Sequence, residues 1–124
     1  MRILVTGSTR WGTPYHEQRV STVLNTVLSL HDQIDHGNKM IVVYGTGEAG
    51  VPAIVDRWVL RRDPEILAEQ LPIDNASANK TLAVALALGR VDLWLSFVDQ
   101  NQGHVQHFRM TTPVSPYVVR EHDE

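Results

Sequence analysis

Near its N-terminus the chain reads Ile3-Leu4-Val5-Thr6-Gly7-Ser8, and this segment sets the fold class. Three apolar residues in a row indicate a strand buried on both faces, and the glycine and serine after them indicate a turn. A second segment of the same kind, Met40–Tyr44, runs directly into Gly45-Thr46-Gly47. Strands of this type are typical of parallel sheets, whose faces are covered by helices.

The remaining apolar patterns alternate between helix and strand. Helical spacing of apolar residues extends over Glu17–Ile34, Val51–Arg61 and Ser77–Leu88, and Gly89 stands where a C-cap glycine is expected. The other expected elements, in chain order, are the strands Leu67–Leu71 and Asp92–Val98, a short helix Val105–Met110 and a last strand Pro116–Val119. This order predicts an α/β, three-layer Rossmann-like domain. Its mostly parallel sheet has about five strands, with helices on both sides.

Length and composition restrict the classes of protein that fit. The chain has 124 residues, of which 43% are hydrophobic and 20% charged, so we expect a single domain over residues 1–124. The absence of cysteine excludes disulfide frameworks, thiolate zinc sites and cysteine nucleophiles. The net charge of -3 makes nucleic acid an unexpected partner. Apolar runs are too short for a signal peptide or a membrane span, so a cytoplasmic protein with no membrane partner is expected, and residues 120–124 are interpreted as a solvated acidic tail.

Glycine follows the predicted strands more often than its modest number suggests. Five of the eight glycines lie after a predicted strand: Gly7, Gly45, Gly47, Gly50 and Gly103. The carboxyl ends of parallel strands meet at one edge of a sheet, where ligands of open α/β sheets bind. Glycine lets backbone N–H groups approach an anion, and a helix N-terminus adds positive potential. We therefore expect a phosphate or ribose-phosphate ligand there. The alternative is that these glycines only form tight strand-to-helix turns.

Known nucleotide and metal motifs are incomplete in this chain. The segment Gly45–Gly50 has G-x-G-x-x-G spacing but follows the second strand and lacks a ribose-binding acid at the expected distance, so no dinucleotide cofactor is expected. Val51-Pro52 after Gly50 excludes a P-loop. His104 and His107 can share a helical face, but no third ligand has a recognisable spacing, so no metal site is expected.

In order and content, these segments resemble the SLOG superfamily, in its YspA/YpsA-related branch of small stand-alone domains. Residues Ile3–Trp11 are similar to the VTGSRxW start of that branch. Val42–Trp58 resembles its glycine-rich VHGGARGAD turn and the tryptophan-bearing helix that follows. Asn79 stands where the family carries an RN pair, and Asp92–Phe97 is similar to its DLVLAF strand. Gly103-His104 stands where the family has the dipeptide GT.

This resemblance implies a Rossmann-like domain that binds nucleotides or nucleotide-derived ligands. Relatives include DNA-processing DprA proteins and the lonely-guy phosphoribohydrolases, which split a base from its ribose 5-phosphate. The chain departs from the family at charged positions: the first arginine is displaced to Arg10, the turn arginine is replaced within residues 46–49, Pro52 stands at the aspartate, and Ala78 precedes Asn79. Ligand binding is therefore better supported than catalysis.

The glycine pattern and the resemblance together define the candidate site. The ligand-binding candidates are Gly7, Ser8, Arg10, Gly45, Thr46, Gly47, Gly50, Asn79, Gly103 and His104. Arg10 would hold a phosphate and Ser8 and Thr46 would donate hydroxyls, although an exposed loop arginine and turn-forming hydroxyls are the alternatives. Glu48, the one carboxylate in the glycine-rich loop, is the candidate catalytic base, with an exposed structural glutamate as the alternative.

The aromatic residues and Asp92 have separate interpretations. Trp11 is interpreted as a platform that stacks on a base at the mouth of the pocket. Trp58 and Trp94 are expected in the core or an interface, and Asp92 is expected to bond backbone groups at the start of its strand.

Three functions follow from these patterns. The first is a module that senses or sequesters a small nucleotide-like ligand. The second is a hydrolase of the N-glycosidic bond in a nucleoside monophosphate, with Glu48 as base. The third is an interaction protein, a homo-oligomer such as a dimer or tetramer, whose inherited pocket has decayed.

Overall fold

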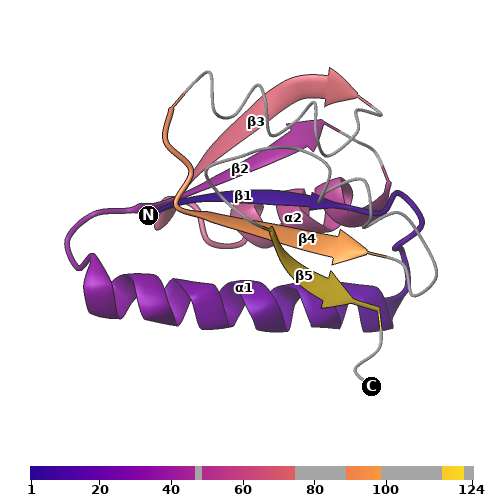
Figure 1. The fold of residues 1–124 in the computed structure, drawn as a ribbon, viewed down its shortest axis with the longest axis horizontal. Coiled ribbons are helices and arrows are strands. Elements are labelled where there is room, and N and C mark those ends of the chain that lie inside the picture. The colour runs from indigo at the N-terminus through magenta and orange to yellow at the C-terminus, as the bar shows by residue number, and fades with distance from the viewer. Residues whose placement is uncertain (47–48, 75–88, 99–115, 122–124) are drawn as a thin grey trace.

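The computed structural model describes residues 1–46, 49–74, 89–98 and 116–121 (Figure 1). The elements, in chain order, are β1 (Arg2–Gly7), α1 (Pro14–Ile34), β2 (Met40–Thr46), α2 (Gly50–Leu60), β3 (Ile66–Asp74), β4 (Leu93–Val98) and β5 (Pro116–Arg120). No helix in the described part of the chain combines the length and the apolar character that crossing a membrane requires.

The five strands form one sheet in the order β3-β2-β1-β4-β5, and every neighbouring pair is parallel. β1 lies at the centre, and its Leu4 is in register with Val43 of β2 and with Trp94 of β4. The parallel α/β sheet expected from the buried-type segments is therefore confirmed. All strands end at the same edge, called here the carboxyl edge.

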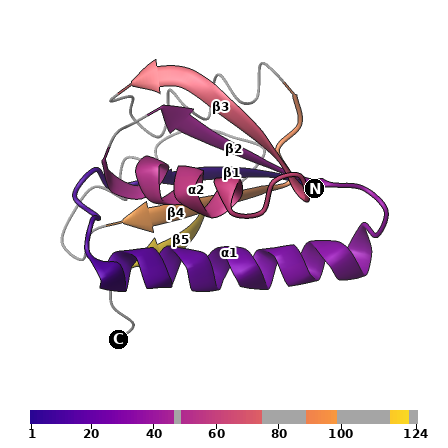
Figure 2. The same ribbon diagram turned by 180° about the vertical axis from the view of Figure 1, so that it is seen from behind.

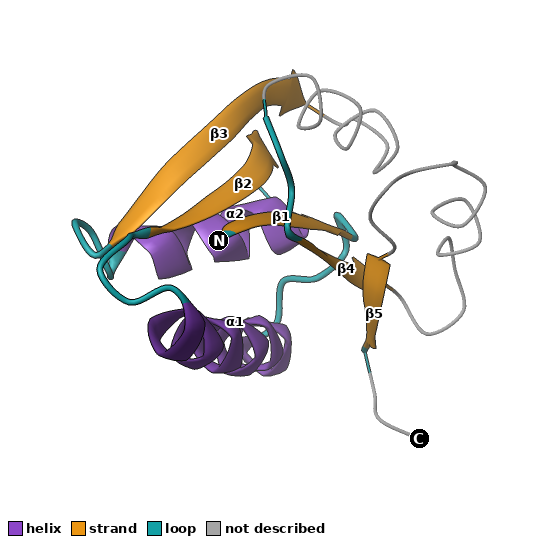
Figure 3. Cartoon of the chain, turned by 60° about the vertical axis from the view of Figure 1, so that its left-hand side comes forward, coloured by secondary structure: helices purple, strands orange, loops and turns teal. Residues whose placement is uncertain are grey.

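Both described helices cover one face of this sheet, as Figures 2 and 3 show. Side chains of Ile3 and Val5 point into that layer, where they join Leu24 of α1 and Trp58 of α2 in the core. Successive side chains of a strand point to opposite faces. Leu4, Val43 and Trp94, each 0% exposed, are thus buried on the other face. The central strands are buried on both sides, as the apolar runs predicted. The helices expected over 77–88 and 105–110 lie outside the described residues.

Helix α1 begins at Pro14, three residues before the predicted start at Glu17. Thr13 is its N-cap: the side chain accepts a hydrogen bond from the backbone N–H of His16, and the His16 ring accepts one from the N–H of Thr13. This reciprocal capping box usually carries glutamate or glutamine where His16 stands. Apolar periodicity does not detect it, because the first turn is held by polar groups.

Polar contacts tie the two helices together and tie α2 to the sheet. Trp58 Nε1 donates to Asn25 Oδ1 at 3.1 Å, and the Arg62 guanidinium lies 4.1 Å above the Trp58 ring. The Tyr44 hydroxyl of β2 donates to Asp56 Oδ1 of α2 at 2.6 Å. Burial, together with this hydrogen bond, raises the pKa of Tyr44. Trp58 and Trp94 are 1% and 0% exposed, so the prediction that they lie in the core is confirmed.

Asp92 links the start of β4 to the start of β1, as the sequence predicted. Its Oδ2 accepts the N–H of Arg2 at 2.9 Å, its own N–H donates to the Arg2 carbonyl at 2.8 Å, and its Oδ1 pairs with Arg90. Partial burial works to raise the pKa of Asp92, but the hydrogen bonds from Arg2 and Arg90 outweigh it and lower the pKa below its ordinary value. The charged carboxylate therefore stabilises the folded state.

This pKa shift predicts an acid-dependent contribution to stability. A folded-state pKa below the unfolded value of about 3.9 contributes stability at higher pH that is lost as pH falls through the folded pKa. We expect Asp92→Asn to lower the free energy of unfolding by about 1 kcal/mol near neutral pH, and by progressively less below about pH 4. Urea unfolding of both proteins from neutral to acid pH measures the difference. The exposed Asp32→Asn is the control, and an Asp92→Asn effect that is equally large in acid would contradict the prediction.

Candidate ligand site at the carboxyl edge of the sheet

The loop after β1 is held between the end of β4 and the start of α2. The N–H of Ser8 donates to the carbonyl of Phe97 at 3.0 Å, and the N–H of Val51 donates to the carbonyl of Ser8 at 3.0 Å. The structure therefore brings together the end of β1 and the first turn of α2, two of the segments that the glycine pattern placed at this edge.

Gly7 and Gly50 permit this close approach. A Cβ on Gly7 would lie 2.6 Å from Val51 Cγ2 and 2.9 Å from the Phe97 carbonyl oxygen. A Cβ on Gly50 would lie 2.5 Å from Thr9 Cα and 2.6 Å from the Ser8 carbonyl oxygen, and Gly50 has a φ of +75°. At these two positions the chain itself fills the space that glycine leaves. The tight-turn interpretation accounts for both residues without a ligand.

Gly45 and Thr46 are strand residues. β2 runs to Thr46, past the predicted end at Tyr44, and its pairing with β3 shifts register between Gly45 and Thr46. The Thr46 hydroxyl donates to the Leu71 carbonyl at 2.6 Å. The hydroxyl hydrogen that we expected to reach a phosphate is thus used to join the two strands, although Thr46 itself stays at the carboxyl edge.

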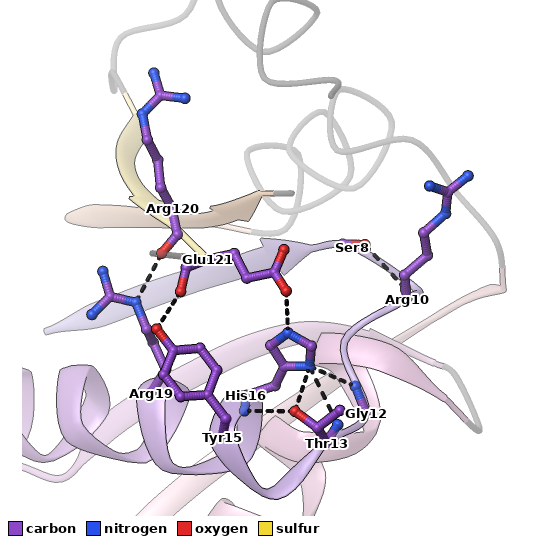
Figure 4. Close-up of polar contacts among 9 residues, drawn as sticks. All are labelled: Ser8, Arg10, Gly12, Thr13, Tyr15, His16, Arg19, Arg120 and Glu121. Atoms are coloured by element: carbon purple, nitrogen blue, oxygen red, sulfur yellow. Dashed lines mark hydrogen bonds and ion pairs between the residues drawn. The ribbon is translucent and has the colours of Figure 1, made fainter. Parts of the chain in front are cut away.

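Ser8 and Arg10 lie in the loop after β1. The backbone N–H of Arg10 donates to Ser8 Oγ at 3.0 Å, so the serine hydroxyl braces the turn. The Arg10 side chain is exposed, and Figure 4 shows its guanidinium extending away from the first turn of α1. It forms no ion pair with any residue that the structure describes.

Among the residues that the structure describes, the N-terminus of α2 faces this loop without a side-chain cap. Its N-cap residue, Ala49, makes no side-chain capping bond, and its first turn carries no acidic residue. The N–H of Val51 is taken by the Ser8 carbonyl, and Pro52 has none. The positive end of the helix dipole remains, and negative charge is stabilised there.

The position of Trp11 differs from the one predicted for it, a stacking platform at the mouth of the pocket. Trp11 is 1% exposed and belongs to the hydrophobic core, with its ring stacked on His16 at a centroid distance of 4.9 Å and edge-on to Phe97 at 5.6 Å. A base cannot stack on a side chain that is already enclosed. The prediction of a platform at the pocket mouth is therefore wrong.

The other candidates have no described position. Gly47, Glu48, Asn79, Gly103, His104 and His107 lie outside the described residues. Within residues 1–46, 49–74, 89–98 and 116–121, no group of three or more potential metal-binding side chains occurs.

A polar cluster that was not predicted from the sequence surrounds the first turn of α1 and is drawn in Figure 4. His16 Nε2 lies 2.8 Å from Glu121 Oε1, the Tyr15 hydroxyl donates to the Glu121 carbonyl, and Arg19 Nε donates to the Arg120 carbonyl at 2.8 Å. Glu121 thus packs on α1, which corrects its assignment to a solvated tail. The only sequence signal was Thr13 three residues before His16, the spacing of a capping box.

Comparison of this chain with protein-family models, with curated proteins and with solved structures finds no match. Membership of the SLOG superfamily accordingly stays a prediction from the sequence motifs.

Proposed function

We propose that the carboxyl edge of the sheet binds a nucleotide or a nucleotide-derived phosphorylated ligand, which the protein senses or sequesters. The observation that carries the proposal is the exposed Arg10 guanidinium. Its loop is fixed by hydrogen bonds against the N-terminus of α2, and the N-cap residue of that helix makes no side-chain capping bond. A phosphate would receive two parallel hydrogen bonds from the arginine and favourable potential from the helix dipole.

The contacts of the loop explain how Arg10 would be held in place. Ser8 is bonded through its N–H to β4 and through its carbonyl to α2, and its hydroxyl accepts the Arg10 N–H. The backbone that carries the arginine is thereby ordered before a ligand arrives, which lowers the entropic cost of binding. The family resemblance adds the nucleotide character of the ligand, and the geometry itself supports an anion.

A second candidate is an oligomeric interaction protein whose pocket has decayed. The close packing at Gly7 and Gly50 favours this second function, because contacts within the chain explain both glycines without a ligand. Sedimentation of the protein over a range of concentrations tests this function, and a monomer at every concentration would count against a dimer or tetramer.

The ligand proposal predicts that Arg10→Ala weakens binding. We expect a thermal-shift screen of nucleoside phosphates to give stabilisation of about 2.7 kcal/mol at a hundred times the dissociation constant. Arg10→Ala should raise that dissociation constant about tenfold to a hundredfold, since it removes charge-assisted hydrogen bonds.

Lys39→Ala is the matched control, because Lys39 directly precedes β2 and lies at the opposite edge of the sheet. It should leave the dissociation constant unchanged. The proposal fails if no nucleotide, sugar phosphate or polyphosphate shifts the melting temperature, or if both variants weaken binding equally. The alternative function, hydrolysis of the N-glycosidic bond, is tested by incubating the protein with nucleoside monophosphates and detecting free base by chromatography.

A further inference from the structure

His16 is a 7% exposed side chain whose two ring nitrogens have different partners. Nδ1 lies 3.1 Å from the backbone nitrogen of Gly12 and 3.3 Å from that of Thr13. Both groups are N–H donors, so Nδ1 must be the unprotonated acceptor. The proton of the neutral ring is then on Nε2, which donates to Glu121 Oε1 at 2.8 Å. Thr13 Oγ1 also lies 3.1 Å from Nδ1, so its hydroxyl faces the same lone pair as the two backbone N–H groups.

The imidazole thereby joins two segments that are far apart in the sequence. Through Nδ1 it holds residues 12 and 13, the end of the loop that carries Ser8 and Arg10. Through Nε2 it holds Glu121, at the end of β5, 105 positions away. Figure 4 shows the ring between these two attachments.

The described groups that face His16 come from α1, the loop before it and the end of β5. The Glu121 carboxylate faces Nε2, and His16 is the third residue of α1, at the helix N-terminus. Tyr15 contacts the ring edge at 5.8 Å between centroids, and Trp11 stacks on its face. Arg19 of α1 is bonded to the Arg120 carbonyl beside Glu121.

We propose that His16 is a proton-sensitive latch on the loop Ser8–Thr13. A proton taken from solvent binds Nδ1 and occupies the lone pair that accepted the Gly12 and Thr13 N–H groups, so both bonds are lost. The bond from Nε2 to Glu121 becomes a charge-assisted ion pair at the same time. Protonation therefore frees the Gly12 and Thr13 amides at the α1 end of the loop, leaves Nδ1–H facing Thr13 Oγ1, and strengthens the attachment of the C-terminal segment. The bonds of Ser8 to β4 and α2 are unaffected.

The consequence for ligand binding rests on the proposed function. Arg10 is presented by this loop, and loss of the two amide bonds removes the brace at its far end. Anion affinity is then lower when the His16 ring is protonated than when it is neutral.

Nuclear magnetic resonance of the isotope-labelled, ligand-free protein tests the latch directly. At about pH 8 the His16 ring should be the Nε2–H tautomer in long-range proton–nitrogen spectra. As the pH is lowered, the Gly12 and Thr13 amides should shift together with the His16 ring. Their hydrogen exchange, corrected for its intrinsic pH dependence, should accelerate about tenfold, as expected for the loss of a hydrogen bond. An Nδ1–H tautomer, or amides that do not follow the ring, would overturn the latch, and neither measurement needs a variant.

Two variants sharpen the test. Glutamine is an ordinary capping-box residue at this position, so His16→Gln keeps an acceptor for the Gly12 and Thr13 amides but cannot titrate. Those amides should stay protected at every pH. Glu121→Gln keeps an acceptor for Nε2–H and removes the charge, so the amide transition should move to lower pH. A transition that persists in His16→Gln would overturn the latch.

Sulfate separates this inference from the proposed function, because its charge is constant over the tested range. We expect sulfate to shift the Ser8 and Arg10 amides with an affinity that falls with pH in the wild type and stays constant in His16→Gln. If sulfate binds with the same pH dependence in both, the effect of the latch on the site is refuted. If sulfate and phosphate fail to bind at any pH while the amides still follow the ring, the proposed function fails and the latch stands.

Discussion

Gly50→Ala is expected to lower the free energy of unfolding by about 3 kcal/mol or more. The residue has a φ of +75°, which costs an alanine about 1–2 kcal/mol. Its new Cβ would also overlap the backbone of Ser8 and Thr9, at 2.5 to 2.9 Å, where no flexible side chain can move aside. The backbone strain and the steric overlap add to each other. To relieve the overlap, the loop after β1 would have to separate from α2. Urea unfolding measures the loss.

Three other glycines supply graded controls. Gly12→Ala meets no atom within 4 Å and has no left-handed φ, so its stability should change by less than about 1 kcal/mol. Gly37→Ala, with a φ of +98° and open space, should lose about 1–2 kcal/mol from backbone strain alone. Gly7→Ala should fall between these and Gly50→Ala, because Val51 would have to shift. Equal losses at Gly12 and Gly50 would show that the turn does not pack as described.

Trp11→Ala is expected to lower the free energy of unfolding by about 3–5 kcal/mol, as for other buried aromatic residues that are cut back to alanine. The indole is 1% exposed and packs on His16 and Phe97, so its removal leaves a cavity between the β1 loop, α1 and the sheet. A base-stacking tryptophan at a pocket mouth would give a different result: weaker nucleotide binding with almost unchanged stability. Chemical unfolding of the ligand-free protein distinguishes the two.

Trp11→Phe and Leu60→Ala are the controls for this prediction. The phenyl ring retains part of the contact, so Trp11→Phe should lose clearly less than Trp11→Ala. Leu60 is 67% exposed at the end of α2, and its truncation should change stability by less than about 0.5 kcal/mol. A Trp11→Ala protein as stable as Leu60→Ala would contradict the placement of Trp11 in the core.

The strands were predictable because their signals are local. The apolar runs at 3–5, 40–44 and 93–98 lie in β1, β2 and β4, and the uncertain segment near Leu67–Leu71 lies within β3. Boundaries were less predictable: β2 continues through Gly45 to Thr46 because pairing with β3 extends it. The start of α1 was placed too late, because the capping box of Thr13 and His16 is polar and apolar spacing does not report it.

The candidate site was predictable in its location and less so in its details. A parallel sheet places Gly7, Thr46 and Gly50 at one edge whatever their side chains do, since all strands end there. Which groups are already used could not be predicted. The Thr46 hydroxyl bonds the Leu71 carbonyl, and the Cβ positions of Gly7 and Gly50 are filled by neighbouring atoms. These facts depend on packing distances of a few tenths of an ångström.

The sequence by itself determined a parallel α/β sheet and the edge at which Gly7, Gly45 and Gly50 lie, because doubly buried apolar runs and helical spacing are properties of neighbouring residues. Only the tertiary structure decided that Trp11 turns into the core and that Glu121 bonds His16 across 105 positions. The Glu121 contact arises because the strand order places β5 next to β4, which brings the end of β5 against the first turn of α1. Trp11 instead packs on His16 of α1 and Phe97 of β4. A side chain's partner depends on that order, and no local pattern encodes it.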